Sequence, residues 1–186
     1  RGATWEEIDL AARVWTIPGE RMKASKAHRV PLSDAAIALL QGMKALALAA
    51  GRTTGKAYVF PSPNSRDPEL GSALSDMTLT AVLRRLKLEA VPHGFRSTFR
   101  DWCAEQTDYP NEVAEMALAH AVGNKVEAAY RRGDLLAKRQ QLMQDWADYA
   151  LGRSAGNMTV GHSSVPLAST RAHTSDQSNN TEGAKQ

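Results

Sequence analysis

Two short runs of alternating, β-branched residues stand near the start of the chain, ARVWTIP at 12–18 and HRVPLS at 28–33. Such runs are typical of half-buried strands, and the polar stretch GERMKASKA between them indicates a hairpin. Lys23 then lies in or near the hairpin turn. From residue 34 onward the apolar residues recur at helical spacing instead. The sequence therefore predicts a mainly α fold with a small antiparallel β-sheet (α+β).

The helical part begins at 34–50, where Ser33 is the expected N-cap. The stretch AYVFPS at 57–62 is a candidate third strand, and Ser75 is the expected cap of the helix that follows. Further helices are predicted at 76–90, 93–106, 110–120, 125–132 and 134–152. The last of these has an apolar face, which we expect to pack on its own domain or on a neighbouring protomer.

The last part of the sequence, 153–186, differs in composition from the rest. It is rich in Ser, Thr, Asn and Gly, has no aromatic residue and shows no apolar periodicity. A segment of this kind cannot bury enough apolar surface to offset the entropy of ordering it. The sequence therefore predicts a folded domain at 1–152 and a disordered C-terminal tail at 153–186.

Composition limits the class of protein. The chain has 186 residues, of which 42% are hydrophobic and 23% charged, as is usual for a globular protein. It contains no apolar run near the roughly 18 residues of a membrane-spanning helix and no signal-peptide pattern, so we expect a soluble, cytoplasmic protein without a membrane partner. A net charge of +3 is too small to indicate nucleic acid by itself. Because the first residue is Arg1 rather than Met, we expect a piece of a longer protein.

His93 and Arg96, in the motif HGFR, are the first candidates for chemistry. Residues three apart lie side by side on a helix, and the helix N-terminus favours an anion, so the pair can address one anionic ligand. The alternative is that His93 caps the helix and Arg96 is a solvated surface charge. The aromatic residues Phe95, Phe99 and Trp102 lie on another face and are expected to pack on the core.

His120 and Tyr130 are further candidates, ten residues apart across a Gly-Asn turn. Each has an ordinary explanation: a histidine at a helix end interacting with the dipole, and a core aromatic whose hydroxyl reaches water. Lys23 likewise has the ordinary role of a solvated turn lysine. The single cysteine, Cys103, is expected to be a packed thiol. No metal is expected, because the histidines and the cysteine of the domain lack the close pair spacing of a zinc site.

The set as a whole has a recognisable order. MKASKAHRVPLS, HGFR, LAHAVGN and AAYRRGD follow one another, with a hairpin first and helices after it. In this order and spacing the chain resembles the tyrosine recombinases of the phage integrase family, most closely the integrases of prophages and genomic islands. The likeness runs from Arg1 to about Gly152 and covers the family's C-terminal catalytic domain. It implies site-specific cleavage and rejoining of DNA strands, to integrate or excise mobile DNA, without a cofactor.

The resemblance also implies a role for each candidate. Tyr130 would attack a DNA phosphodiester and form a 3′-phosphotyrosine intermediate. Arg96 would grip the non-bridging oxygens, and His93 would help accept the tyrosine proton. His120 would hydrogen-bond the phosphate, and Lys23 would protonate the departing 5′ oxygen.

The partners that the resemblance implies are double-stranded DNA attachment sites and, on DNA, further copies of the chain in a tetramer. Phosphate contacts from Lys26 and Arg131 are expected as well, although surface cations are more often merely solvated. The helix predicted at 134–152 would pack on a neighbouring protomer in such an assembly.

Two departures from the family pattern bear on activity. The family's first catalytic arginine, in an Arg-x-x-Glu motif, would precede Arg1, and LAH carries Ala119 where many relatives have glycine. An alternative function is therefore a catalytically impaired DNA-binding or oligomerisation remnant of an integrase. A type IB topoisomerase shares the tyrosine chemistry, but the compact hairpin with Lys23 and the position of His120 favour an integrase.

Overall fold

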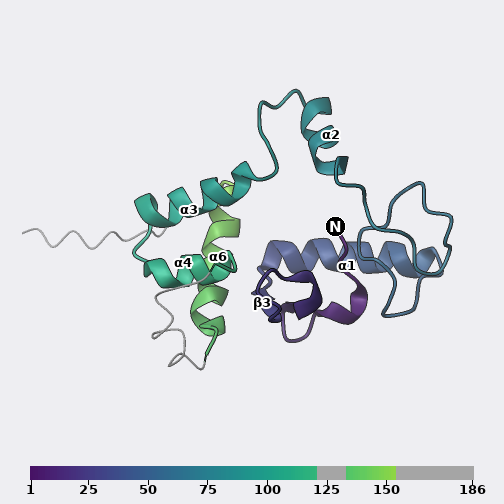
Figure 1. Cartoon of the computed structure of the whole chain (residues 1–186), viewed down its shortest axis with the longest axis horizontal. Helices are drawn as coiled ribbons and strands as arrows, with labels where there is room; N and C mark the ends of the chain where they lie inside the picture. The colour runs from purple at the N-terminus through teal and green to yellow at the C-terminus, as the bar shows by residue number, and fades with distance from the viewer. Residues whose placement is uncertain (121–132, 154–186) are drawn as a thin grey trace, which may run out of the picture. The chain divides into compact units, whose positions relative to one another are not determined.

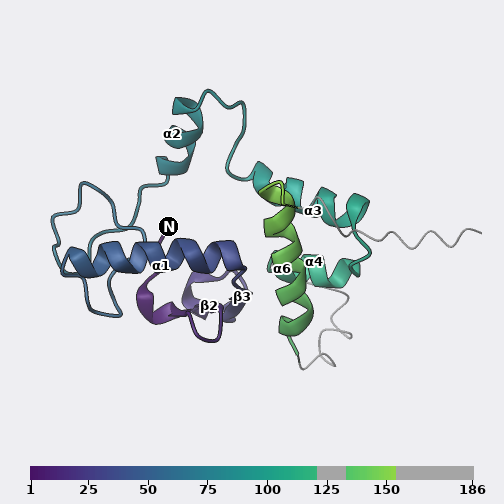
Figure 2. The same ribbon diagram turned by 180° about the vertical axis from the view of Figure 1, so that it is seen from behind.

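The structure is a computed structural model that describes residues 1–120 and 133–153, seen from opposite sides in Figures 1 and 2. Within the described residues a small sheet comes first and α-helices follow, which confirms the predicted α+β fold class. The α-helices are α1 (Asp34–Ala49), α2 (Thr78–Arg85), α3 (Gly94–Gln106), α4 (Asn111–Ala117) and α6 (Leu136–Ala150). The predicted helix at 125–132 and the predicted tail beyond Arg153 lie outside the described residues.

The sheet is antiparallel throughout. Its strands, in the spatial order β1-β2-β3, are β1 (Ile8–Asp9), β2 (Val14–Ile17) and β3 (His28–Pro31). Strands β2 and β3 pair Trp15 with Val30, and the predicted hairpin is thereby confirmed. Strand β1 pairs Ile8 with Trp15. It was not predicted, because two residues are too few to show an alternating pattern.

The third strand predicted at 57–62 is wrong. Tyr58 forms only an isolated bridge with Thr4, and Pro61 forms another with Ala73. A proline has no N–H to donate to a ladder, so pairing does not extend through this segment. The segment still belongs to the folded interior, because alternate residues of it are buried.

Helix α1 shares a core with the hairpin residue Trp15 and is capped as predicted. The hydroxyl Oγ of Ser33 accepts a hydrogen bond from the backbone N–H of Ala36 at 3.3 Å. Residues from the N-terminal segment, α1 and the stretch near residue 58 together form the first core: Ala3, Trp5, Leu32, Ile37, Leu40, Ala47, Ala57 and Val59. The opposite face of α1 carries exposed leucines, among them Leu39 and Leu46.

A second core joins α3, α4 and α6, whose ribbons can be followed in Figures 1 and 2. Its buried members are Phe99, Trp102, Cys103, Val113, Ala114 and Leu142. The apolar face predicted for 134–152 therefore packs on its own domain. Phe95 departs from the prediction, because its side chain is 56% exposed. Helical spacing identifies the face of a helix, but not how far along that face the neighbouring helices extend.

Helix α2 is shorter than the predicted 76–90. Ser75 does not cap it by accepting a backbone N–H with its side chain; its Oγ lies 3.0 Å from Oγ1 of Thr78 instead. The helix stops at Arg85, and Lys87 then adopts a left-handed backbone with φ of +54°. A residue in this region cannot continue a right-handed helix.

A buried arginine connects the helices of the second core to the sheet. Arg139 on α6 is 1% exposed. Its Nη1 donates to the backbone oxygen of Arg29 on β3 at 2.6 Å, and its Nε donates to the backbone oxygen of Asp134 at 2.7 Å. The Asp134 carboxylate lies 3.0 Å from Nη2 of Arg139 and accepts two hydrogen bonds from Arg29, both at 2.8 Å. We call these three residues the Arg139 junction.

In the Arg139 junction two arginines share the carboxylate of Asp134. Hydrogen bonds from Arg29, followed by the charge of Arg139, hold the pKa of Asp134 below its usual value. Burial lowers the pKa of Arg139, and the charge of Asp134 opposes that shift. A second link lies nearby, where the backbone N–H of Asp34 at the start of α1 donates to Oε1 of Gln144 on α6 at 2.9 Å.

Removing the guanidinium of Arg139 should destabilise the chain. In Arg139→Met the apolar stem is kept, but the backbone oxygens of Arg29 and Asp134 lose their donors. We expect the free energy of unfolding to fall by about 2–4 kcal/mol. The matched control is Lys138→Met, one residue away on the exposed side of α6, which should change it by less than about 0.5 kcal/mol. Urea unfolding measures both, and equal effects would contradict the role given to Arg139.

Candidate functional site

The hairpin loop holds Lys23 in a tight turn. After the short 3-10 helix Gly19–Arg21, the backbone N–H of Ser25 donates to the carbonyl of Met22 at 3.0 Å, and Lys23 is exposed within this turn. The loop closes tightly on itself, because a Cβ added to Gly19 would lie 2.9 Å from the backbone oxygen of Ser25. Gly19 therefore permits the close approach that shapes the loop around Lys23.

His93 and Arg96 stand at the start of α3. His93 occupies the N-cap position, but its side chain makes no capping hydrogen bond, so the capping alternative for this residue is not supported. Arg96 lies in the first turn, and both side chains are exposed. The pair therefore faces outward from the N-terminus of α3, as the three-residue spacing predicts.

His120 follows α4 through a left-handed residue. Ala119 has φ of +56°, and this turn lets the backbone N–H of His120 donate to the carbonyl of Glu115 at 2.9 Å. Nη2 of Arg96 donates to the backbone oxygen of Leu118 at 2.7 Å and lies 2.8 Å from Nε2 of His120. The imidazole of His120 and the guanidinium of Arg96 are therefore direct neighbours.

These three regions line one cavity of about 840 Å³. Its lining residues are Arg21, Met22, Lys23, Ala24, His93, Arg96, Ser97, Arg100, Asp101, Leu118, Ala119 and His120. The hairpin loop, the start of α3 and the end of α4 thus bring together Lys23, His93, Arg96 and His120. Cationic and histidine side chains outnumber the acidic one, Asp101, so the cavity suits an anion such as a phosphate.

Three candidates are not among the residues that line the cavity. Tyr130 and Arg131 are outside the described residues. Lys26 belongs to the hairpin loop and is exposed, but it does not line the cavity.

Sequence reasoning missed Glu115, whose carboxylate lies behind the cavity. Its Oε2 is 2.7 Å from Nδ1 of His120, and its Oε1 accepts from Nε of Arg100 at 2.6 Å. Hydrogen bonds from His120 first, and then from Arg100, hold the pKa of Glu115 below its usual value, so it is ionised at neutral pH. Glu115 and His120 are five residues apart, which does not make them neighbours on a regular helix. The left-handed Ala119 brings them together, and an alanine does not by itself indicate such a turn.

His28 was also missed as a neighbour of this region. Burial lowers its pKa, the charge of Arg139 adds to that effect, and a hydrogen bond with the backbone of Ala117 opposes it. The hairpin strand β3 therefore contacts the end of α4 as well as the Arg139 junction.

Cys103 is buried in the second core, as predicted for a packed thiol. Burial raises its pKa to about 11, so the thiol stays protonated and is a poor nucleophile at neutral pH. Among residues 1–120 and 133–153, no group of three or more His, Cys, Asp and Glu side chains is arranged to hold a metal ion. In the same residues no helix has the length and apolar character to span a membrane.

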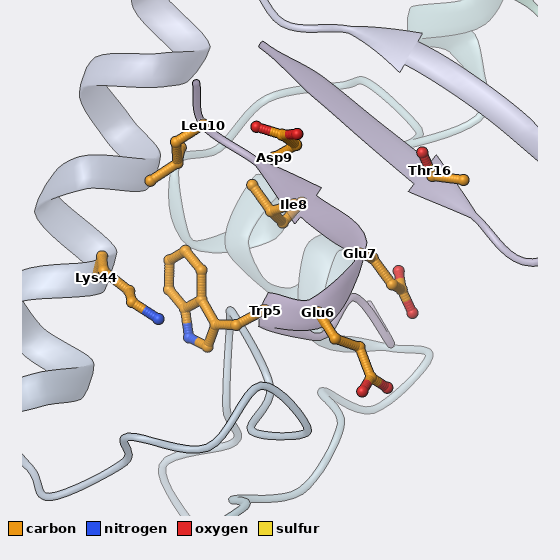
Figure 3. Close-up of a pocket in the computed structure, with 8 residues that line it drawn as sticks. All are labelled: Trp5, Glu6, Glu7, Ile8, Asp9, Leu10, Thr16 and Lys44. Carbon is orange, nitrogen blue, oxygen red and sulfur yellow. The ribbon is translucent and has the colours of Figure 1, made fainter. Parts of the chain in front are cut away.

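A second hollow, of about 450 Å³, lies beside the first residues of the chain (Figure 3). The ring of Trp5 points toward α1, where Nζ of Lys44 lies 4.6 Å from its centroid. The lining also includes the carboxylates of Glu6, Glu7 and Asp9. These acidic groups would repel a phosphate, and no predicted site residue lines this hollow.

Comparison with known proteins gives matches to one family of proteins. The model of the phage integrase family matches residues 1–135. Prophage integrase IntA of Escherichia coli (strain K12) is 38% identical over 162 residues, which cover 86% of this chain and 37% of that protein. The integrase of Shigella phage Sf6 is 30% identical over 151 residues, or 80% of this chain and 37% of that protein. No solved structure matches the chain.

Prophage integrase IntZ of Escherichia coli (strain K12) is a further relative, 35% identical over 155 residues, which cover 82% of this chain and 36% of that protein. The chain therefore spans between 36% and 37% of the length of these three relatives.

The left-handed backbone at Ala119 leads to a stability prediction. An L-residue with a side chain is strained there by about 1–2 kcal/mol, and glycine relieves that strain while losing about 0.4–1 kcal/mol to its freer unfolded chain. Ala119→Gly should therefore raise the free energy of unfolding by up to about 1 kcal/mol, seen as a higher urea midpoint. Ala104→Gly, at an exposed position inside α3, is the control and should lower it by about 1 kcal/mol. A loss in both variants would contradict the role assigned to the turn.

Proposed function

Because the chain belongs to the phage integrase family, we propose that it is the catalytic part of a tyrosine-type site-specific DNA recombinase. The observation that carries this proposal is the cavity shared by Lys23, His93, Arg96 and His120. These residues come from three separate stretches of sequence, and they are ones to which the family resemblance gives a role in cleaving the DNA strand. The names of the relatives, which are prophage and phage integrases, support integration or excision of mobile DNA.

In the proposed reaction, the phenolic oxygen of Tyr130 attacks a DNA phosphorus atom. A phosphorus–oxygen bond to tyrosine forms, the bond to the 5′ oxygen breaks, and the DNA is left as a 3′-phosphotyrosine and a 5′-hydroxyl. One phosphodiester replaces another, so rejoining needs neither ATP nor a metal. His93 takes the tyrosine proton, and Lys23 gives a proton to the departing 5′ oxygen.

Arg96 and His120 stabilise the charge that develops on the phosphate. A guanidinium can donate two parallel hydrogen bonds to non-bridging oxygens, and Arg96 already presents its Nη2 group beside the His120 ring at 2.8 Å. This Nη2 group also donates to the carbonyl of Leu118. A bound phosphate oxygen would compete with that carbonyl for the same donor.

The wider assignments follow from the same proposal. Residues 1–152 form the catalytic domain and 153–186 a tail, and Lys26 and Arg131 contact backbone phosphates. The substrate is a double-stranded attachment site, and copies of the chain act as a tetramer on it in the cytoplasm.

A nicked suicide substrate tests the proposal, because loss of the short DNA end traps the covalent intermediate. The full-length gene product and the 186-residue chain are each incubated with DNA carrying the attachment site of the gene's own element. We expect the full-length product to form a denaturation-resistant adduct that Tyr130→Phe abolishes. Tyr149→Phe on α6 removes a hydroxyl away from the proposed chemistry and should leave the adduct unchanged.

The outcomes separate the alternatives. An adduct that persists in Tyr130→Phe would show that another residue is the nucleophile. DNA binding by the full-length product without any adduct would favour the impaired remnant over the recombinase.

A further inference from the structure

We propose that Glu115 is a positioning residue for His120, one that fixes which ring nitrogen carries the proton and which nitrogen faces the cavity. The proposal rests on the proposed function, because it concerns the histidine that would contact the DNA phosphate. It is carried by a chain of contacts across three side chains. Glu115 Oε2 lies 2.7 Å from Nδ1 of His120, and Nε2 of the same ring lies 2.8 Å from Nη2 of Arg96.

The chemistry of these contacts determines the tautomer. A guanidinium has only N–H donors, so Nε2 of His120 must accept from Arg96. The proton of the neutral ring is then on Nδ1, which donates to the carboxylate of Glu115. Since a carboxylate only accepts, Nδ1 stays protonated whether the ring is neutral or charged. A phosphate oxygen only accepts hydrogen bonds, so His120 donates to it from Nε2 as the doubly protonated ring, whose Nδ1–H the Glu115 carboxylate holds in place.

Glu115 is itself held in place from the other side. Its Oε1 accepts from Nε of Arg100 on α3 at 2.6 Å, and Arg100 also donates through Nη2 to the side chain of Asn111. Each carboxylate oxygen thus faces one donor, and the two contacts fix the plane of the carboxylate. The backbone carbonyl of Glu115 meanwhile accepts from the N–H of His120 at 2.9 Å. One residue therefore orients both the backbone and the ring of His120.

This arrangement predicts that glutamine cannot replace Glu115. Glutamine has one acceptor oxygen and one NH₂ donor, whereas Arg100 and His120 both present donors. If the oxygen faces Arg100, the NH₂ group faces Nδ1, and the ring must move its proton to Nε2. An N–H on Nε2 would then oppose the N–H groups of Arg96. Either the ring rotates away or the contact with Arg100 is lost.

The tautomer can be measured without any variant or any activity. In the full-length gene product, ¹⁵N spectra of the histidine rings distinguish a proton on Nδ1 from one on Nε2, and the His120 signals are assigned by their loss in His120→Ala. We expect the proton on Nδ1 in the wild-type protein and a shift toward Nε2, or a mixture, in Glu115→Gln. A wild-type ring protonated on Nε2, or a spectrum unchanged in Glu115→Gln, would overturn the proposal.

Cleavage of the suicide substrate supplies the second measurement. Glu115→Gln should slow adduct formation by about 10- to 100-fold, the size of the loss seen when the partner that orients a metal-bound histidine is removed. In a His120→Ala background the same change should slow it by less than about twofold, because Glu115 then has no ring to position. Glu105→Gln, exposed on α3, should leave the rate unchanged.

The ring spectra and the cleavage rates can each contradict the role of Glu115 without the other. A merely structural Glu115, one that only fastens α4 to Arg100, would slow cleavage by the same factor with and without His120, and that result would overturn the proposal. If the wild-type protein forms no adduct at all, the proposed function fails, and the ring spectra still decide the role of Glu115. If Glu115→Gln does not fold, as judged by circular dichroism, the wild-type ring spectrum decides it.

Discussion

The buried guanidinium of Arg139 is the contact on which the candidate site depends. The first core lies under the hairpin and α1, and the second joins α3, α4 and α6. Arg139 reaches from α6 to the backbone of Arg29 on β3, while Asp134 accepts from the arginines on both sides. Lys23 belongs to the hairpin, whereas His93, Arg96 and His120 belong to the helices. Polar contacts between the two parts therefore help to bring together the residues that line the cavity.

Backbone features set the positions of the site residues within each part. A glycine lets the hairpin loop close behind Lys23, and a left-handed alanine turns the chain so that His120 meets Arg96 and Glu115. Neither feature is reactive itself. Local conformation and buried charge thus organise exposed groups that, as solvated side chains, would have no fixed arrangement.

The sequence predicted much of this fold, because the hairpin, the cap at Ser33 and most helices follow from local patterns of apolar spacing and cap residues. It failed where position depends on distant partners: Phe95 follows the aromatic spacing but is exposed, and the segment 57–62 is strand-like but joins no sheet. The candidate residues came from motif order, which pointed to Arg96 and His120. The contact between Glu115 and His120 escaped prediction, since it depends on a turn that an alanine does not signal.

The contacts of Arg139 have a consequence for folding during synthesis on the ribosome. Arg29 precedes Arg139 by 110 residues, and Asp34 precedes its own partner Gln144 by 110 residues. At about 5–20 residues per second on the ribosome, the hairpin waits roughly 5–20 s for α6 to be synthesised. Contacts of such long range also slow folding after release. During that interval the backbone oxygen of Arg29 on β3 is without its Arg139 donor.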